Sequence, residues 1–258
     1  MRLVSIHPSL RSTPMRSMPP IFTSLACGLL LLGSVSSAHA ALTISHTRII
    51  HDSAKRSASV IIANPSDRTF AAQAWVNTEA DDQTTPVALV ASPSLFRIDP
   101  GKEQSVQINA LPNDLPQDRE SLFYFNLQEI PQTQPGDAQN ALTIALRTRI
   151  KLFYRPSMLG KTPQDGLKDL TWSVQMVEGK AHLVVDNPTP YHYTFNNVVV
   201  SSASTSESVN ANNMAPPLGR QSYPLRSFSA ADDLEVRFTT INDYSGTSAE
   251  LTSPVARQ

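Results

Sequence analysis

Cysteine is almost absent from this sequence of 258 residues, in which Cys27 is the single one. It lies in an apolar run near the N-terminus, and the residues just before it lack the leucine expected in a lipoprotein signal. A small apolar residue within a signal sequence is the simpler interpretation of Cys27. Once such a signal is removed, the chain has neither a thiol nor a disulfide bond, so its stability must come from hydrophobic cores.

Glycine is scarce, at 9 residues, and basic residues are not in excess. Few glycines argue against the Gly-rich loops that bind phosphate groups. Residues 1–40 hold three basic residues and no acidic one, which leaves 18 basic against 22 acidic residues, a net charge of −4. Because a nucleic-acid footprint needs a basic excess, we expect no nucleic-acid partner.

The sequence also lacks the patterns of an enzyme. His46, His51, His182 and His192 form no H-x-H or H-x-x-x-H pair, and no cysteine can join them as a metal ligand. There is no G-x-S-x-G elbow and no P-loop. A hydrolase would need paired carboxylates, and Asp81-Asp82 fits a solvated loop better. We therefore predict no catalytic site, no cofactor and no metal site.

The N-terminal residues have the plan of a secretory signal peptide. Three arginines precede an apolar run at 21–35, and Ala38-His39-Ala40 is a small-x-small cleavage site. An uncleaved membrane anchor is the alternative, but the run is too short for a permanent spanning helix. We predict that residues 1–40 are a signal peptide and that the protein is exported.

After residue 40 the pattern is that of β-strands. Short apolar or alternating runs end at prolines, which number 20, and no helical period of useful length is present. The first series of predicted strands covers 42–50, 59–63, 70–76, 87–91, 95–98, 105–110, 121–130 and 141–154. In 70–76, Ala72, Ala74 and Val76 face one way and Trp75 the other. This spacing predicts a β-sandwich domain over 41–157.

A second series of strands follows a linker at 157–166, which has no apolar period. These predicted strands cover 170–177, 181–185, 191–200, 234–240 and 247–251, and a Ser-, Asn- and Thr-rich stretch at 201–215 predicts a long loop. The second domain is therefore expected over 158–258, and the fold class is all-β with two sandwiches.

Two segments carry a resemblance to a known family. Residues 115–131 read Leu-Pro-Gln-Asp-Arg-Glu-Ser-Leu-Phe-Tyr-Phe-Asn-Leu-Gln-Glu-Ile-Pro, and residues 150–156 read Ile-Lys-Leu-Phe-Tyr-Arg-Pro. Shorter matches lie at 47–48, 72–75, 187–191 and 241–244, in the same order as in the family. The sequence resembles the PapD-like periplasmic pilus chaperones of the chaperone–usher pathway.

The resemblance implies two immunoglobulin-like domains in a boomerang arrangement around a cleft. It implies a periplasmic chaperone that binds pilus (fimbrial) subunits, or pilins, whose fold lacks its last strand, and delivers them to an outer-membrane usher. The chaperone fills the gap with a strand of its own, a form of strand addition. An exposed apolar edge strand is also consistent with a self-capping homodimer.

Residues 141–150, the donor segment, match the strand that the family lends. Leu142, Ile144 and Leu146 alternate with smaller or polar residues, so three large apolar side chains project from one face. Burying each in a partner is worth about 1.5–3 kcal/mol before the costs of association. From alternation alone, the same residues fit the core of the chaperone itself better.

Arg48 and Lys151 match the two cleft cations of the family, which by resemblance bind the C-terminal carboxylate of the pilin. Charge-assisted hydrogen bonds to a carboxylate are stronger than neutral ones. Strict alternation puts Lys151 on the face opposite Leu142, Ile144 and Leu146. Either a bulge intervenes, or the two roles use different faces.

Glu120, Arg155 and Asp243 match an ion cluster that links the two domains in the family. They come from distant parts of the chain, so the resemblance implies that they meet near the hinge and set the angle between the domains.

The sequence departs from some relatives at three places. The C-terminal end has no cysteine for a disulfide, the stretch 92–95 lacks two consecutive prolines, and the connection 132–140 is short, as in the short-loop branch. The alternative to a chaperone is an exported tandem-sandwich binding or adhesion module. Such a module would recognise its partner by loops and gives no reason for Arg48 and Lys151 to converge.

Overall fold

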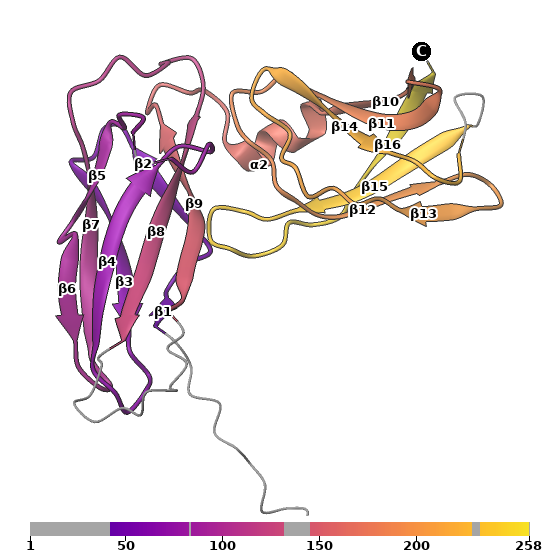
Figure 1. The fold of residues 1–258 in the computed structure, drawn as a ribbon. Helices are drawn as coiled ribbons and strands as arrows, with labels where there is room; N and C mark the ends of the chain where they lie inside the picture. Colours follow the sequence, from indigo (N-terminus) through magenta and orange to yellow (C-terminus); the bar gives the residue numbers. More distant parts are fainter. Residues whose placement is uncertain (1–41, 83, 132–144, 229–232, 258) are drawn as a thin grey trace, which may run out of the picture. The chain divides into compact units, whose positions relative to one another are not determined.

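The structure is a computed structural model that describes residues 42–82, 84–131, 145–228 and 233–257 (Figure 1). The predicted signal peptide, Leu142 and Ile144 lie outside these residues. The described residues belong to one compact unit and are nearly all in strands and turns. None of the helices in the described ranges is long and apolar enough to cross a membrane.

The first domain is built from two sheets that face each other across one core. The four-stranded sheet has the order β1-β3-β7-β5, and the five-stranded sheet has the order β2-β9-β8-β4-β6. The strands are β1 (Thr43–Ile44), β2 (Arg48–Asp52), β3 (Ser57–Ala63), β4 (Phe70–Asn77), β5 (Leu89–Ser92), β6 (Leu95–Ile98), β7 (Glu103–Ala110), β8 (Ser121–Pro131) and β9 (Arg147–Arg155). The prediction of a β-sandwich here is confirmed.

Alternation along the strands decides which side chains form this core. In β4, Ala72, Ala74 and Val76 are buried, while Trp75 between them lies on the other face, as the sequence predicts. In β8, Phe123, Phe125 and Leu127 point into the same core. Side chains of the intervening positions of β4, β8 and β9 therefore lie on the outer face of the five-stranded sheet.

The first predicted strand, 42–50, is wrong as a single element. The structure divides it into β1, which pairs with β3, and β2, which pairs in parallel with β9 in the opposite sheet. The chain crosses between the sheets at 45–47, where Ser45 uses its side chain and backbone to bond to Ile61 of β3. Because β2 begins only after this crossing, at Arg48, it pairs with the second part of β9 and leaves the first part without a neighbour on that side among the described residues.

The second domain has a seven-stranded sheet that curls around its own core, in the order β13-β12-β15-β16-β10-β11-β14. Its strands are β10 (Thr171–Val177), β11 (Lys180–Asn187), β12 (Phe195–Ser201), β13 (Ser206–Ser208), β14 (Gly219–Pro224), β15 (Leu234–Thr240) and β16 (Leu251–Arg257). Trp172 lies at the centre, in ring contact with Phe195 and Phe238. The second sandwich-like domain is thereby confirmed.

Several predicted boundaries of the second domain are wrong. The last strand runs over Leu251–Arg257 rather than 247–251, and the predicted loop at 201–215 contains the short strand β13. Strand β14 was not predicted, because Tyr223 is the only large apolar residue in Gly219–Pro224. The linker contains the helix α2 (Pro163–Gly166), capped by the hydroxyl of Thr162, followed by the 3₁₀ turn η1 (Leu167–Asp169).

Candidate functional site

Strand β9 has one free edge over the first part of its length. Strand β8 pairs with β9 from Arg147 to Tyr154, but β2 pairs with it only from Lys151 to Arg155. Within the part of the chain that the structure describes, residues 147–150 have no strand on the β2 side. Their backbone groups on that side can hydrogen-bond to an added strand.

The donor segment leads into this free edge. Of its three apolar side chains, only Leu146 is described, and 48% of its surface is exposed. Its carbonyl accepts a hydrogen bond from the backbone of Glu129, so it extends the β8–β9 ladder. An exposed leucine beside an unpaired edge leaves both apolar surface and backbone groups available to a partner.

Pairing between β8 and β9 runs without a register shift. Ile150, Leu152 and Tyr154 therefore turn into the core, while Arg149, Lys151 and Phe153 lie on the outer face. Side chains alternate between the two faces of a strand, and Leu146 is an even number of positions from Ile150 and Leu152. Leu146 therefore lies on the same face as these residues and on the face opposite Lys151. For Leu146, the one described member of the three, this agrees with the arrangement in which the two roles use different faces; Leu142 and Ile144 lie outside the described residues.

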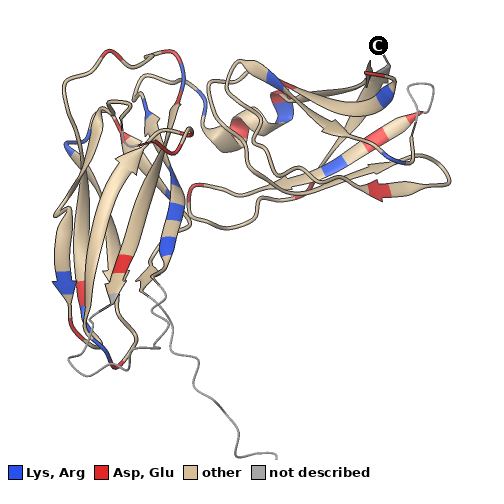
Figure 2. Ribbon diagram, viewed as in Figure 1, with Lys and Arg blue, Asp and Glu red and all other residues tan. Residues whose placement is uncertain are grey.

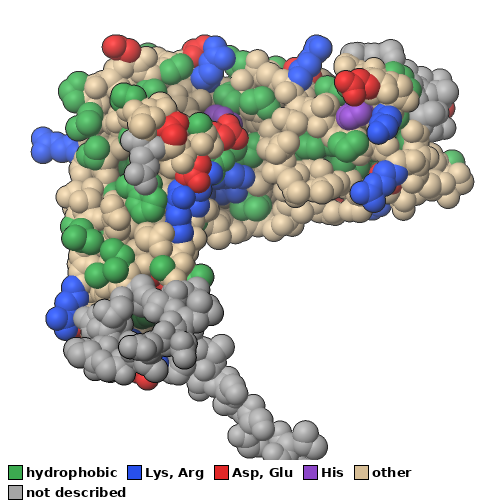
Figure 3. All heavy atoms as spheres, in the orientation of Figure 1, with side chains coloured by type: hydrophobic (Ala, Val, Ile, Leu, Met, Phe, Trp, Pro, Cys, Tyr) green, Lys and Arg blue, Asp and Glu red, His purple; other side chains and the backbone are tan. Residues whose placement is uncertain are grey.

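Basic residues recur along the outer face of β9. Arg147, Arg149, Lys151 and Arg155 occupy alternate positions, with Phe153 at the one between Lys151 and Arg155. Figure 2 shows successive blue bands along β9. Arg147 pairs with Asp81, and Arg149 lies over the ring of Tyr124 at 3.7 Å and donates to the carbonyl of Thr78. In Figure 3, acidic and basic side chains of the visible face lie next to one another rather than in separate fields.

Arg48 and Lys151 are Cα partners at the first position of the β2–β9 pair. The Arg48 side chain lies over the ring of Phe153, 5.9 Å from its centroid, and its Nη1 donates to the carbonyl of Ile241 at 2.8 Å. The Lys151 Nζ lies 3.2 Å from the hydroxyl oxygen of Thr194. Among the described residues, neither cation has a carboxylate within ion-pair distance.

Burial makes the charged forms of both side chains less favourable. It lowers the pKa of Arg48, an effect that the charges of Asp243 and Glu120 partly oppose. Burial, followed by the charge of Arg48, lowers the pKa of Lys151 to about 8. Arg48 is only 6% exposed, and its Nε is buried without a hydrogen-bond partner in the described part of the chain. A bound anion would offset these costs.

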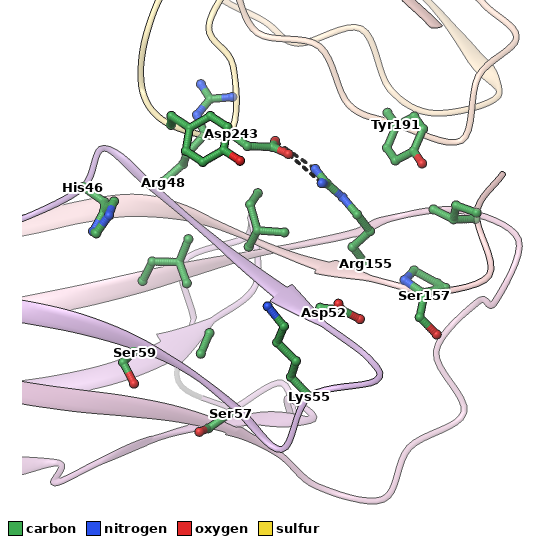
Figure 4. Close-up of a pocket in the computed structure, with 16 residues that line it drawn as sticks. His46, Arg48, Asp52, Lys55, Ser57, Ser59, Arg155, Ser157, Tyr191 and Asp243 are labelled. Carbon is green, nitrogen blue, oxygen red and sulfur yellow. Dashed lines mark hydrogen bonds and ion pairs between the residues drawn. The ribbon is translucent and has the colours of Figure 1, made fainter. Parts of the chain in front are cut away.

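Two pockets lie beside Arg48. One, of about 470 Å³, is lined by Arg48, Phe153, His192, Tyr193 and Ile241, among others. The other, of about 630 Å³, is also lined by Arg48 and is drawn in Figure 4, where Arg155 and Asp243 pair on its wall. Space for a ligand group is therefore present next to Arg48.

The structure places Glu120, Arg155 and Asp243 in one ion cluster. The Nε of Arg155 donates to Glu120 at 2.7 Å, and its Nη1 and Nη2 donate to the two oxygens of Asp243 at 2.6 and 2.9 Å. Burial alone would lower the pKa of Arg155, but the hydrogen bonds and charges of the two carboxylates outweigh it and raise that pKa. Glu120 also accepts from the backbone of His192 at 2.8 Å.

Sequence reasoning missed the residues that support the cations. Phe153 is buried under Arg48 and lies in ring contact with His192. Thr194 and the carbonyl of Ile241 supply polar partners from the second domain. Phe153 could have been found as an outward-facing aromatic between Lys151 and Arg155, whereas nothing in the sequence marks Thr194. No group of three His, Cys, Asp or Glu side chains within the described ranges could hold a metal ion.

Comparison with protein families gives two matches that together cover most of the chain. Residues 41–160 match the N-terminal domain of the pili and flagellar-assembly chaperone PapD, and residues 165–252 match the C-terminal domain of the pili assembly chaperone PapD. The chain belongs to the PapD-like chaperone family. Its function is that of a pilus-assembly chaperone.

Named relatives agree with this assignment. The chain is 33% identical over 233 residues to the probable fimbrial chaperone YadV of Escherichia coli K12, covering 87% of this chain and 94% of YadV. It is 33% identical over 217 residues to the chaperone protein PapD of Escherichia coli, covering 82% and 86% of the two chains.

Solved structures show the same architecture. The crystal structure of the YadV chaperone has a TM-score of 0.71 at 30% identity, covering 83% of this chain and 98% of that one. The CupB2 chaperone of Pseudomonas aeruginosa has a TM-score of 0.67 at 28% identity, covering 83% of this chain and all of its own.

Proposed function

We propose that this chaperone holds a pilus subunit by adding the donor segment and the start of β9 to the incomplete sheet of the subunit. Arg48 and Lys151 then bind the C-terminal carboxylate of that subunit. The observation that carries the proposal is the coincidence of two features. The free edge of β9 ends at Lys151, and there Arg48 and Lys151 meet as neighbours without a carboxylate partner among the described residues.

This geometry defines the direction of the bound strand. A strand that lies along residues 147–150 and ends with its carboxylate at Lys151 must run in the same direction as β9. It would continue the line of β2, which is also parallel to β9. The subunit strand would therefore form a parallel ladder with β9, with Leu146 and its two preceding partners, Leu142 and Ile144, filling the apolar groove of the subunit.

The carboxylate is a suitable anchor for physical reasons. A chain terminus occurs once in each subunit, so binding it determines the register of the added strand. A carboxylate between two partly buried cations forms charge-assisted hydrogen bonds. It also offsets the mutual repulsion of Arg48 and Lys151, which contributes to the lowered pKa of the lysine.

Glu120, Arg155 and Asp243 have a different role in this proposal. They satisfy one another's charges and hold the end of β9 to the loop that contains Asp243. They would position the anchor rather than bind the subunit. The proposal has three further parts. The chain is exported by a signal peptide at 1–40 that is then cleaved. The chaperone delivers the subunit to an outer-membrane usher, and the free chaperone self-associates through the free edge of β9.

The test is capture of subunits in the periplasm of the native host. Tagged wild-type chaperone, Lys151→Ala and the matched control Lys180→Ala, which changes an exposed lysine of the second domain, are purified, and bound proteins are identified by mass spectrometry. We expect pilus subunits with wild type and the control and none with Lys151→Ala. Subunits on all three chains would remove Lys151 from the anchor. No subunits on any chain, with their genes expressed, would favour an exported binding module.

A further inference from the structure

Two arginines and two carboxylates line the same pocket beside the anchor. The pocket of about 470 Å³ has Arg48, Arg155, Glu120 and Asp243 in its wall. The formal charges of these four side chains cancel, yet their pairing is unequal. Arg155 binds both carboxylates, whereas Arg48 binds neither and reaches only a backbone carbonyl among the described residues.

Every carboxylate oxygen of the ion cluster already has a donor. Arg155 donates from Nε to the Oε1 of Glu120, and from its two terminal nitrogens to the two oxygens of Asp243. The remaining oxygen, the Oε2 of Glu120, accepts a hydrogen bond from the backbone nitrogen of His192 at 2.8 Å. Both acids are therefore satisfied without any contribution from Arg48.

Arg48 is close enough to compete for these acids. Its Nη1 donates at 2.8 Å to the carbonyl of Ile241, which precedes Asp243 by two residues in the same loop. Two residues span at most about 7 Å. The charges of Asp243 and Glu120 both act on Arg48 and raise its pKa against the effect of burial. In Figure 4, however, the Asp243 carboxylate is turned toward Arg155.

Arg48 has a donor to spare, and Asp243 is the acid that can turn toward it. The Nε of Arg48 is buried without a hydrogen-bond partner in the described part of the chain. A bond to a carboxylate is stronger than the bond to a neutral carbonyl that Arg48 makes now. The Asp243 side chain is 33% exposed, against 2% for Glu120, and its two bonds to Arg155 fix its orientation.

We propose that Arg155 is a positioning residue for the anchor, which holds Asp243 and Glu120 away from Arg48 so that Arg48 stays available for the carboxylate of the subunit. Without Arg155, Asp243 pairs with Arg48, and the chaperone blocks its own anchor. This inference deepens the proposed function and rests on it. It gives the ion cluster a role beyond setting the angle between the domains.

The first measurement needs no subunit. The NMR signal of the Arg48 Nε–H, assigned by its absence from Arg48→Lys, reports whether Arg48 has gained a carboxylate partner. In Arg155→Ala we expect this signal to move downfield, because a charge-assisted hydrogen bond is short and strong. In Arg155→Ala/Asp243→Asn we expect it to return to its wild-type position. An unchanged signal in Arg155→Ala would overturn the proposal.

The second measurement is subunit capture in the periplasm of the native host. Arg155→Ala should co-purify about tenfold less subunit than wild type, and Arg155→Ala/Asp243→Asn should recover most of the wild-type amount. The matched control is Arg155→Ala/Asp169→Asn, which removes a different acid of the second domain, paired with Lys161, and should not recover. If the cluster only sets the angle between the domains, Asp243→Asn removes one more contact and gives no rescue, which would overturn the proposal.

Arg155→Lys is a milder variant in case Arg155→Ala does not fold. A lysine keeps a positive charge beside Glu120 but lacks the fork that holds both carboxylates. We expect a partial loss of capture that Asp243→Asn restores, and a loss without rescue would contradict the proposal. The two measurements also separate this inference from the proposed function. An Arg48 signal that responds as expected, with normal capture by every variant, would confirm the exchange of partners and overturn the proposed anchor instead.

Discussion

Arg48 and Lys151 lie side by side as the first Cα pair of β2 and β9, and each reaches a different polar group of the second domain. Arg48 donates to the carbonyl of Ile241, and Lys151 lies at hydrogen-bond distance from Thr194. The positive charges of these neighbouring side chains repel each other, and both side chains are partly buried. An arrangement of this kind costs stability in the free protein, and the proposed subunit carboxylate would offset that cost.

Removing either cation should abolish subunit capture without unfolding the chaperone. Loss of one member of a desolvated charge pair typically weakens binding by about 2–5 kcal/mol, so Arg48→Ala and Lys151→Ala should each lower the amount of co-purified subunit by more than tenfold. Circular dichroism and the melting temperature should stay close to wild type. Arg48→Lys should retain part of the capture, because it keeps the charge but loses the fork of donors. Normal capture by either alanine variant would contradict the anchor.

Anchoring should also depend on pH. In the free protein the pKa of Lys151 is about 8, so the ammonium form is lost as the pH rises through that value. The affinity for a subunit should therefore fall between pH 7 and pH 9 in wild type. Lys151→Arg, whose charge persists over this range, should show little change. A flat wild-type profile in isothermal titration would mean that the protonation of Lys151 does not contribute to binding.

As the pH rises, the folding stability of the free chaperone should increase, whereas its affinity for a subunit should fall. The folded-state pKa of Lys151 is depressed from 10.5 to about 8, so the unfolded chain binds more protons between these two values. Folding stability is therefore expected to rise with pH across this window. Urea unfolding of wild type and Lys151→Met at pH 7.5 and 9.5 isolates the contribution, which should be absent from the methionine variant.

The ion cluster predicts unequal effects of its members. Arg155→Ala leaves the carboxylate of Glu120, whose side chain is 2% exposed, without its arginine partner and with only His192 beside it. Breaking a buried pair in this way costs about 3–5 kcal/mol. Asp243→Ala should cost less, because Arg155 still pairs with Glu120 and the Asp243 side chain is 33% exposed. If urea unfolding gives the reverse order, Asp243 rather than Glu120 is the main partner of Arg155.

An acidic residue in the donor segment should separate capture from stability. Leu146 is half exposed, so Leu146→Asp should leave the melting temperature nearly unchanged while placing a charge in the apolar groove of the subunit. The same outcome is expected for Ile144→Asp. Val90→Asp, at an exposed position of β5, is the matched control and should capture normally. A large fall in the melting temperature of Leu146→Asp would assign Leu146 to the core of the chaperone.

The sequence predicted the fold because alternation and prolines identify most strands of the first domain, such as β4, directly. It failed where an element depends on tertiary pairing. Strand β14 has only Tyr223 as a large apolar residue and forms because β11 offers it an edge. The division of the first strand into β1 and β2 also has no local signal, although it leaves the edge of β9 free.

Only part of the candidate site was predicted from the sequence, because the rest also depends on tertiary structure. Arg48, Lys151 and the ion cluster could be named because the chain resembles a known family over the motifs that contain them. Thr194 and the carbonyl of Ile241 contact the cations through the arrangement of the second domain. A backbone carbonyl carries no residue-specific signal, and a lone threonine just before a strand is ordinary, so neither could be found before the structure.

Arg147 should position the start of β9 without contacting the subunit anchor. Its guanidinium pairs with Asp81 and donates to Asn126, and the ring of Trp75 lies 5.0 Å away. Asp81 is held in turn by Asn77 at 2.7 Å. Arg147→Ala removes these contacts and frees the first residues of β9 to fluctuate. Faster hydrogen exchange at residues 147–150 and a faster dissociation of the subunit are expected, because the donor segment is no longer held in an extended form.

The matched control for this variant is Arg97→Ala. Arg97 also pairs with an aspartate, Asp99, but both side chains are largely exposed and lie on the β6 side of the sheet, and such pairs contribute little to stability. Exchange at 147–150 and subunit dissociation should match wild type in this control. Arg147→Lys distinguishes charge from geometry, since a lysine can pair with Asp81 but cannot also bridge to Asn126 as the fork of arginine does. Unchanged exchange in Arg147→Ala would show that pairing with β8 alone holds the start of β9 in place.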